Sequence, residues 1–258
     1  MPQIKPNLLM REWTVLSLRP HGQHAVAHCA SELRGAKFLA CSSMKLEAVK
    51  NDAALKNALT CDHIIVTSPA AARFAGLSPV FTVTQKSRWL ALGTGTAAIL
   101  KKIGISNISV PENGSNSESL LAMPALQNLQ GQTIGLITAP GGRGLIEPAL
   151  IDRGALVRVA FMYQRKIMPI AAEEIEAIAN LHKPFAVLCS SHEVFESFWQ
   201  QLNTELKEKM HTGLWIVSSV RLQTLLQQSG VLNTTVSASP QPDAMLEHWV
   251  HVQAQHLR

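Results

Sequence analysis

A short unit occurs six times along the chain: an apolar run, a turn of small or polar residues, and then the start of a helical pattern. Each unit is typical of a parallel strand that leads into a helix through a Ser, Thr or Gly turn. Such a turn leaves backbone N–H groups unpaired at the positive end of the helix dipole, where anions bind. Several of these turns along one edge of a sheet therefore predict an anion-binding surface. The six units cover residues 15–23, 64–74, 90–100, 136–146, 186–195 and 214–225.

The alternation of strand and helix patterns predicts right-handed βαβ units, so the expected fold class is α/β. Two stretches interrupt it: an apolar run at residues 37–44, and residues 163–169, which contain an extended Met-Pro step. If both are crossings between the same two domains, they are linker strands. Domain one then consists of residues 1–36 and 170–258, and domain two is the inserted segment 45–162. We therefore expect two domains, each a parallel β-sheet flanked by helices, joined by a two-stranded linker.

Composition narrows the class of protein. The 258 residues are 47% hydrophobic and 16% charged, which is typical of a globular α/β protein rather than a disordered one. No apolar stretch is long enough to cross a membrane and no secretory signal is evident, so we expect a cytoplasmic protein. The four cysteines never form Cys-x-x-Cys, which argues against structural zinc. The net charge of +5 comes from scattered residues, which favours an anionic small molecule over nucleic acid.

One motif suggests a different function. Residues 93–98 match the pattern G-x-G-x-x-A between a predicted strand and a predicted helix, and Glu112 lies near the spacing of a ribose-binding acid. However, Glu112 falls in a polar loop instead of at the tip of the next strand. We interpret the glycines as helix-packing residues and keep a nucleotide-dependent oxidoreductase as an alternative.

The histidines form two groups that could suggest a metal. His21, His24 and His28 share one face of a predicted helix, and His248 and His251 form a second pair. Neither group has a carboxylate or cysteine partner in the sequence, so we predict solvated helix histidines and no metal site.

The turns after the predicted strands carry the candidate binding residues. The turn at 139–144 is too short for a phosphate-binding loop of the Walker type, but its N–H groups and Arg143 suit a carboxylate. Serines that follow strands are interpreted as helix N-caps instead of nucleophiles: Ser68, Ser190 and Ser218.

Tyr163 is the only tyrosine in the chain and lies at the end of a predicted strand, beside the proposed crossing between the domains. A phenol at this place has a proton to donate. The alternative is an aromatic residue that packs at the boundary with its hydroxyl satisfied.

In this order, the segments resemble the uroporphyrinogen-III synthase family over nearly the whole chain. The resemblance is carried by Arg19-Pro20 after the first strand, by residues 66–75 and 91–100, and above all by residues 141–165. In that family the last segment is likewise a Gly-Gly-Arg turn, a helix, an Arg-Gly-Ala step, a strand, and a Tyr with an Arg nearby.

The resemblance implies two α/β domains joined by a two-stranded linker. It also implies a hydro-lyase of tetrapyrrole (haem) biosynthesis, which cyclises hydroxymethylbilane to uroporphyrinogen III with inversion of the terminal ring and loss of water. No metal or organic cofactor is expected. The expected partner is this small-molecule substrate, without nucleic acid or membrane, and the protein is expected to be a monomer. The alternative is a non-catalytic two-domain binding protein for an anionic small molecule.

By its matching motifs, the resemblance implies that Tyr163 is the catalytic residue, as general acid or hydrogen-bond donor to the departing hydroxyl. It also implies that Thr96 contributes to the substrate site. Leu18 and the turn at 217–222 depart from the family pattern, which puts their domain-one contacts in doubt. The remaining residues assigned to the substrate's carboxylates are Ser68, Gly142, Arg143, Ser191, Ser218 and Arg19.

Overall fold

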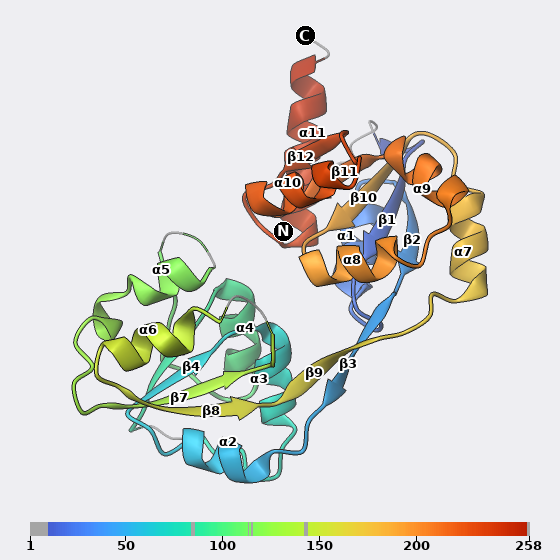
Figure 1. The fold of residues 1–258 in the computed structure, drawn as a ribbon. Helices are drawn as coiled ribbons and strands as arrows, with labels where there is room; N and C mark the ends of the chain where they lie inside the picture. Colours follow the sequence, from blue (N-terminus) through green and yellow to red (C-terminus); the bar gives the residue numbers. More distant parts are fainter. Residues whose placement is uncertain (1–9, 84–85, 113, 115, 142–143, 257–258) are drawn as a thin grey trace. The chain divides into compact units, whose positions relative to one another are not determined.

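The chain forms two compact units, which we call unit 1 and unit 2 (Figure 1). Unit 1 combines the chain up to Lys45 with the chain from Lys166 onward, and unit 2 is Leu46–Arg165. The chain therefore passes from one unit to the other twice. The structure is a computed structural model, and it describes residues 10–83, 86–112, 114, 116–141 and 144–256.

Unit 1 contains a five-stranded parallel sheet with the order β12-β11-β10-β1-β2. After β1 the chain adds β2 along one edge of β1. The later strands β10, β11 and β12 are added in turn along the other edge of β1. The order therefore reverses between β1 and β10, and ligands of open α/β sheets bind at the carboxyl ends of strands at such a point. The strands are β1 (Thr14–Leu18), β2 (Lys37–Cys41), β10 (Phe185–Cys189), β11 (Leu214–Val217) and β12 (Thr234–Val236).

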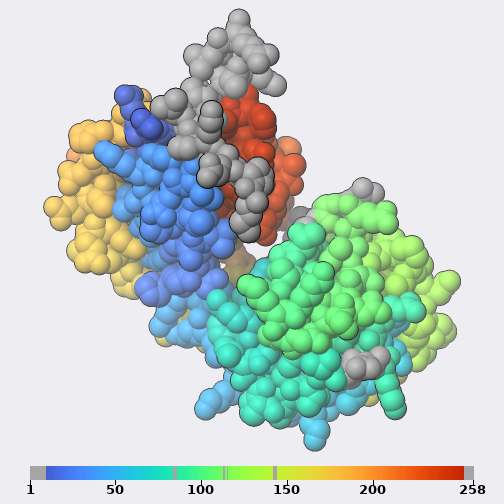
Figure 2. Space-filling model, turned by 180° about the vertical axis from the view of Figure 1, so that it is seen from behind, coloured from blue at the N-terminus to red at the C-terminus, as the bar shows by residue number. Residues whose placement is uncertain are grey.

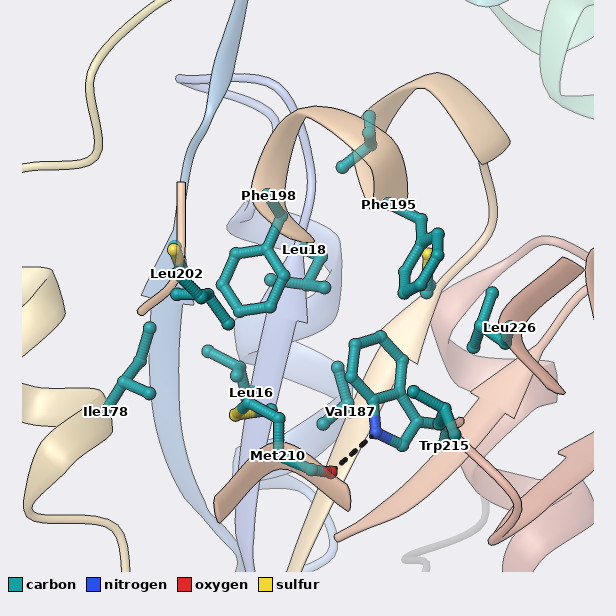
Figure 3. Close-up of a cluster of buried hydrophobic side chains, with 14 of the residues drawn as sticks. Leu16, Leu18, Ile178, Val187, Phe195, Phe198, Leu202, Met210, Trp215 and Leu226 are labelled. Carbon is teal, nitrogen blue, oxygen red and sulfur yellow. Dashed lines mark hydrogen bonds between the residues drawn. The ribbon is translucent and has the colours of Figure 1, made fainter. Parts of the chain in front are cut away.

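Helices cover both faces of this sheet because its strands alternate buried side chains between two cores. Leu16, Val187 and Trp215 pack in one core with residues of α7, α8, α9 and α10 (Figure 3). Val15 and Ile216 point to the other face, against α1 and α11. The helices are α1 (Ala25–Glu32), α7 (Ala172–Ala179), α8 (His192–Trp199), α9 (Thr204–His211), α10 (Val220–Gln228) and α11 (Pro242–His256).

Unit 2 contains a second five-stranded parallel sheet, with the order β6-β5-β4-β7-β8. From β4 the chain moves outward through β5 to β6 and then returns to the other side of β4 as β7 and β8. The order therefore reverses between β4 and β7. The strands are β4 (His63–Val66), β5 (Arg88–Ala91), β6 (Ile108–Ser109), β7 (Thr133–Thr138) and β8 (Leu156–Phe161).

Two apolar cores flank the sheet of unit 2. Ile64 and Val66 face α2, α3 and α4, whereas Ile65 faces α5, α6 and the short 3-10 helix η2. From behind, the teal and green residues of α3 and α4 form much of the visible surface of unit 2 (Figure 2). The helices are α2 (Asp52–Ala58), α3 (Pro69–Gly76), α4 (Thr94–Lys102), α5 (Ser117–Leu121), η2 (Pro124–Leu126) and α6 (Ile146–Asp152).

A small antiparallel sheet joins β3 (Met44–Ala48) to β9 (Tyr163–Ile167). The α/β class with two helix-flanked parallel sheets, expected from the sequence, is thus confirmed. The bounds of one linker strand were wrong, because residues 37–41 of the expected strand 37–44 form β2 and pair with β1. The first four residues of the segment expected as domain two, residues 45–48, belong to β3.

In the part of the chain that the structure describes, no helix is both long and apolar enough to cross a membrane.

Candidate active site

A pocket of about 360 Å³ opens at the carboxyl edge of the unit 2 sheet, where the strand order reverses between β4 and β7. Thr67 and Ser68 follow β4 and line one part of it, and Thr138 to Gly141 at the end of β7 line another. Thr67 and Thr138 share a hydrogen bond of 2.7 Å between their hydroxyl oxygens, which ties the two turns together. The pocket is therefore built from the turns that the sequence predicts as anion-binding.

Tyr163 lines this pocket although its side chain is only 3% exposed. Its hydroxyl oxygen lies 3.1 Å from Ser68 Oγ, and its ring stacks on Phe74 of α3 with the ring centroids 5.6 Å apart. The guanidinium carbon of Arg165 lies 5.6 Å from the centroid of the tyrosine ring. The phenol is thus held in place, and its hydroxyl is oriented by a polar partner at the pocket wall.

Arg165 connects Tyr163 to the turn after β7. Its Nη1 donates a hydrogen bond of 2.9 Å to the carbonyl oxygen of Pro140. Among the described residues that line the pocket, Arg165 is the one cation and Glu147 the one carboxylate. A guanidinium beside several hydroxyl groups suits a carboxylate ligand. In the family pattern an arginine lies near this tyrosine, but Arg165 was not among the residues predicted for the site.

The other candidates of unit 2 fall in different places. Thr96 lies in the first turn of α4, is 3% exposed, and is not among the residues that line the pocket. Gly142 and Arg143 lie outside the described residues, although Gly141 and Gly144 on either side of them line the pocket. The structure therefore brings Ser68 and Tyr163 together and leaves Thr96 apart from them.

A larger depression, of about 640 Å³, is formed at the opposite edge of the same sheet. Residues that precede β4 and β5, such as Asp62 and Ser87, line it together with Lys56 and Lys86. None of the predicted site residues lies there, and ligands of parallel sheets bind at the carboxyl edge. We therefore place the candidate site in the smaller pocket.

In unit 1, serines gather at the carboxyl edge of the sheet because four of its strands are followed directly by one. These are Ser42, Ser190, Ser218 and Ser237. The sequence interpretation of Ser190 and Ser218 as helix N-caps is wrong by one residue. The N-cap of α8 is Ser191, and that of α10 is Ser219, whose Oγ accepts a hydrogen bond from the N–H of Leu222.

The three candidates of unit 1 lie at this edge. The Oγ of Ser218 donates a hydrogen bond of 3.2 Å to the carbonyl oxygen of Ser190, so the turns after β10 and β11 are joined. Ser191 is half-buried, and its side chain makes no capping bond. Arg19 follows β1 and donates from Nη2 to the carbonyl oxygen of Pro240 over 2.9 Å. Burial lowers the pKa of Arg19, although the nearby Cys189 opposes this shift.

His24 was not assigned to the site, and the prediction that it is a solvated helix residue is wrong. Its ring bridges two buried serines, with Nδ1 3.0 Å from Ser17 Oγ and Nε2 2.9 Å from Ser42 Oγ. Burial lowers the pKa of His24 to about 4, and the charges of Arg19 and His21 contribute to the shift. The two serines come from different strands, since Ser17 lies on β1 and Ser42 directly follows β2, so no local sequence pattern indicated this contact.

The neutral state of His24 predicts a pH dependence of stability. An unfolded histidine has a pKa of about 6.5. Between pH 6.5 and 4 the unfolded chain therefore binds a proton that the folded chain excludes, so the free energy of unfolding falls as the pH falls through this window. The variant His24→Gln lacks this component, and its free energy of unfolding should depend less on pH. Urea unfolding at a series of pH values checks this, and equal slopes for the two proteins would contradict it.

The alternatives with a metal or a dinucleotide receive no support. Within the described residues, no three His, Cys, Asp or Glu side chains gather in a way that could hold a metal ion. The pattern at 93–98 lies after β5, away from the place where the strand order reverses. Glu112 lines a separate depression with Glu118, beyond the end of β6.

Comparisons with known proteins agree with one another. A family model described as "Uroporphyrinogen-III synthase HemD" matches residues 26–247. A curated relative, the uroporphyrinogen-III synthase of Escherichia coli strain K12, is 29% identical over 160 residues, which are 61% of this chain and 65% of the relative. The alignment thus spans less than two thirds of the relative's length.

Two solved structures share the fold. The uroporphyrinogen-III synthetase of Helicobacter pylori 26695 has a TM-score of 0.61 at 14% identity, over 93% of this chain and 99% of the other. A mutant uroporphyrinogen III synthase from the extremely thermophilic bacterium Thermus thermophilus has a TM-score of 0.58 at 20% identity, over 94% and 99%. At these identities the likeness concerns the fold.

Proposed function

Because the chain belongs to the uroporphyrinogen-III synthase family, we propose that it is a hydro-lyase of tetrapyrrole biosynthesis that cyclises hydroxymethylbilane to uroporphyrinogen III. The observation that carries the proposal is the pocket of unit 2. There the family's tyrosine, Tyr163, lies at the wall with its hydroxyl beside that of Ser68. The nearby Arg165 supplies a positive charge for an acidic substrate.

The reaction needs a proton or hydrogen-bond donor at the oxygen of the substrate's hydroxymethyl group. The carbon–oxygen bond of that group breaks, the oxygen takes up a proton and leaves as water, and the bilane becomes an electrophilic azafulvenium cation. This carbon bonds to the substituted carbon of the last ring to give a spiro intermediate, which fragments and closes again with the ring inverted. The proton taken up by the leaving hydroxyl is balanced by the proton lost from the last ring on final closure. Tyr163 is the residue placed to donate to the leaving oxygen.

The rest of the catalytic effect lies in the shape of the bound chain. In water the bilane closes without inversion, so the protein must hold the substituted carbon nearest to the electrophile, which is an effect of proximity and orientation. The protein can hold the bilane in this conformation through its acetate and propionate arms. We assign them to turn N–H groups and cations. The residues assigned to this role are Gly142 and Arg143 in unit 2, and Arg19, Ser191 and Ser218 in unit 1.

The organisation proposed from the sequence accompanies this function. We propose that units 1 and 2 act as its two domains, with β3 and β9 as the two-stranded connection. The monomeric state, the cytoplasmic location and the independence from a metal or organic cofactor also stay predictions.

Product analysis tests the proposed function. Purified protein is mixed with bilane that a separate enzyme generates in the same vessel, and the oxidised products are separated by isomer. We expect a shift from isomer I, which forms spontaneously, to isomer III. A protein that binds the bilane but leaves isomer I as the product would be the non-catalytic binding protein of the alternative.

The variant Tyr163→Phe tests the donor. It removes one hydroxyl and keeps the ring that stacks on Phe74, so we expect the rate of isomer III formation to fall about tenfold with the fold intact. Initial rates of the two proteins give the effect on activity. Their circular dichroism spectra and melting temperatures show whether the fold is intact. A variant with the wild-type rate would remove Tyr163 from the mechanism.

A further inference from the structure

Ser68 forms hydrogen bonds both with α3 and with Tyr163. It is the N-cap of α3, where its Oγ accepts a hydrogen bond of 3.0 Å from the N–H of Ala71. The same oxygen lies 3.1 Å from the hydroxyl oxygen of Tyr163. A serine hydroxyl has two acceptor lone pairs and one donor hydrogen. One lone pair is filled by Ala71, and the hydrogen or the second lone pair is used by Tyr163.

The same helix fixes the ring of Tyr163. Phe74 lies six residues after Ser68 on α3 and stacks on the tyrosine ring with an interplanar angle of 21°. Since the side chain is also 3% exposed, its ring has little freedom to move. What remains free is the direction of the phenolic hydrogen about its carbon–oxygen bond. Ser68 is the residue in contact with that oxygen, and so it is placed to set this direction.

From this geometry we infer that Ser68 is a positioning residue for the Tyr163 hydroxyl, in place of the carboxylate-binding role that the sequence suggested. The inference rests on the proposed function of the Tyr163 pocket. When Ser68 donates its hydrogen to the phenolic oxygen, the phenol's own hydrogen is free to point at the departing hydroxyl. The hydrogen bond from Ala71 to Ser68 Oγ polarises the serine and strengthens this donation.

Every proton in the proposed step has a source and a destination. In the step that breaks the carbon–oxygen bond, Tyr163 donates to the leaving oxygen, and Ser68 keeps its own proton while it hydrogen-bonds the phenolic oxygen. The proton released from the last ring on closure restores the starting state. Ser68 therefore contributes only while Tyr163 is present, which distinguishes it from a residue that holds a substrate arm.

A double-mutant cycle tests this dependence. We expect Ser68→Ala to lower kcat about fivefold with KM unchanged, which corresponds to one lost neutral hydrogen bond. In the Tyr163→Phe background the same change should lower kcat less than about twofold. Ser68→Thr keeps a hydroxyl and should restore most of the rate. If Ser68 instead holds a carboxylate, KM rises and the effect persists in full without the phenol, and the inference is overturned.

Loss of the helix cap needs its own control, because Ser68→Ala also removes the bond to Ala71. Asn203 caps α9 in the same way, accepting the N–H of Leu206 over 2.9 Å, and it belongs to unit 1, whereas Tyr163 belongs to unit 2. Asn203→Ala should therefore lower stability by a similar amount with unchanged kcat. A fall in kcat equal to that of Ser68→Ala would assign the effect to capping and overturn the inference.

A spectroscopic measurement separates this inference from the proposed function. Because Tyr163 is the only tyrosine in the chain, the tyrosine doublet in the ultraviolet resonance Raman spectrum belongs to it alone. The intensity ratio of the doublet reports whether the phenol donates or accepts a hydrogen bond. We expect the ratio to change in Ser68→Ala but not in Asn203→Ala, and an unchanged ratio in Ser68→Ala overturns the inference. If the wild-type protein shows no turnover, the proposed function and the contribution of Ser68 to it are overturned, while the Raman ratio still tests whether Ser68 orients the Tyr163 hydroxyl.

Discussion

Replacing Trp215 by alanine is expected to lower the free energy of unfolding of unit 1 by about 4 kcal/mol. The side chain is fully buried on β11, at the centre of the core between the sheet and α8 (Figure 3). The centroid of its ring lies 5.7 Å from the ring centroid of Phe195 and 6.4 Å from that of Phe198. Its Nε1 donates a hydrogen bond to the carbonyl oxygen of Met210. Alanine would leave a cavity that this close-packed core cannot fill.

Trp215→Phe is the matched control. It keeps an aromatic ring in the core but removes the indole donor, which leaves the carbonyl oxygen of Met210 with only the 3.3 Å bond from the N–H of Gly213, so we expect an intermediate loss of about 2 kcal/mol. Denaturant unfolding gives the free energies, and hydrogen exchange read by mass spectrometry assigns them to unit 1. A loss below about 1 kcal/mol in Trp215→Ala would contradict the close packing of this core.

Gly135→Ala is expected to destabilise unit 2 by about 3 kcal/mol. Gly135 lies on β7, where α2 crosses it so closely that an added Cβ would be 2.8 Å from the carbonyl carbon of Ala58 and closer still to its oxygen. These are backbone atoms and cannot rotate away. Relief of the clash therefore requires α2 to move from the sheet, which opens the core that α2 shares with β7 and β8.

Gly131→Ala separates this clash from backbone strain. Gly131 has a φ of +73° with no atom within 4 Å of an added Cβ, so alanine there costs only about 1 kcal/mol of left-handed strain. Thermal unfolding of both variants gives the comparison. A melting temperature of Gly135→Ala equal to or above that of Gly131→Ala would show that the clash costs no more than the left-handed strain, and would contradict the prediction.

Much of the fold could be predicted from the sequence because the apolar runs are strong and the turns after them are small and polar. Five of the six units contain a parallel strand that leads into a helix, and the unit at 15–23 ends just before α1. The two-stranded connection was also expected. The strand at residues 44–48 was missed, because an isolated run such as Met-Lys-Leu-Glu-Ala has good helix formers and gains its strand conformation only by pairing with β9.

The candidate site was also predicted only in part. Ser68 and Tyr163 are adjacent in space although they are 95 residues apart, and the sequence assigned both to the site without stating their contact. His24 was misread because its partners, Ser17 and Ser42, come from two strands whose pairing the sequence could not establish. Arg165 was seen as part of a motif, but its bond to Pro140 depends on the turn after β7.

From the residues alone we could predict most of the strands and helices, the turns that carry small polar residues, and the family, since these depend on local patterns and on the order of motifs. Only the tertiary structure decided the order of the strands in each sheet, and therefore which two turns form the pocket and which hydroxyls meet. The physical reason is that parallel strands pair through non-local hydrogen bonds. Neighbours at the carboxyl edge are chosen by the packing of whole helices and strands, which no local pattern records.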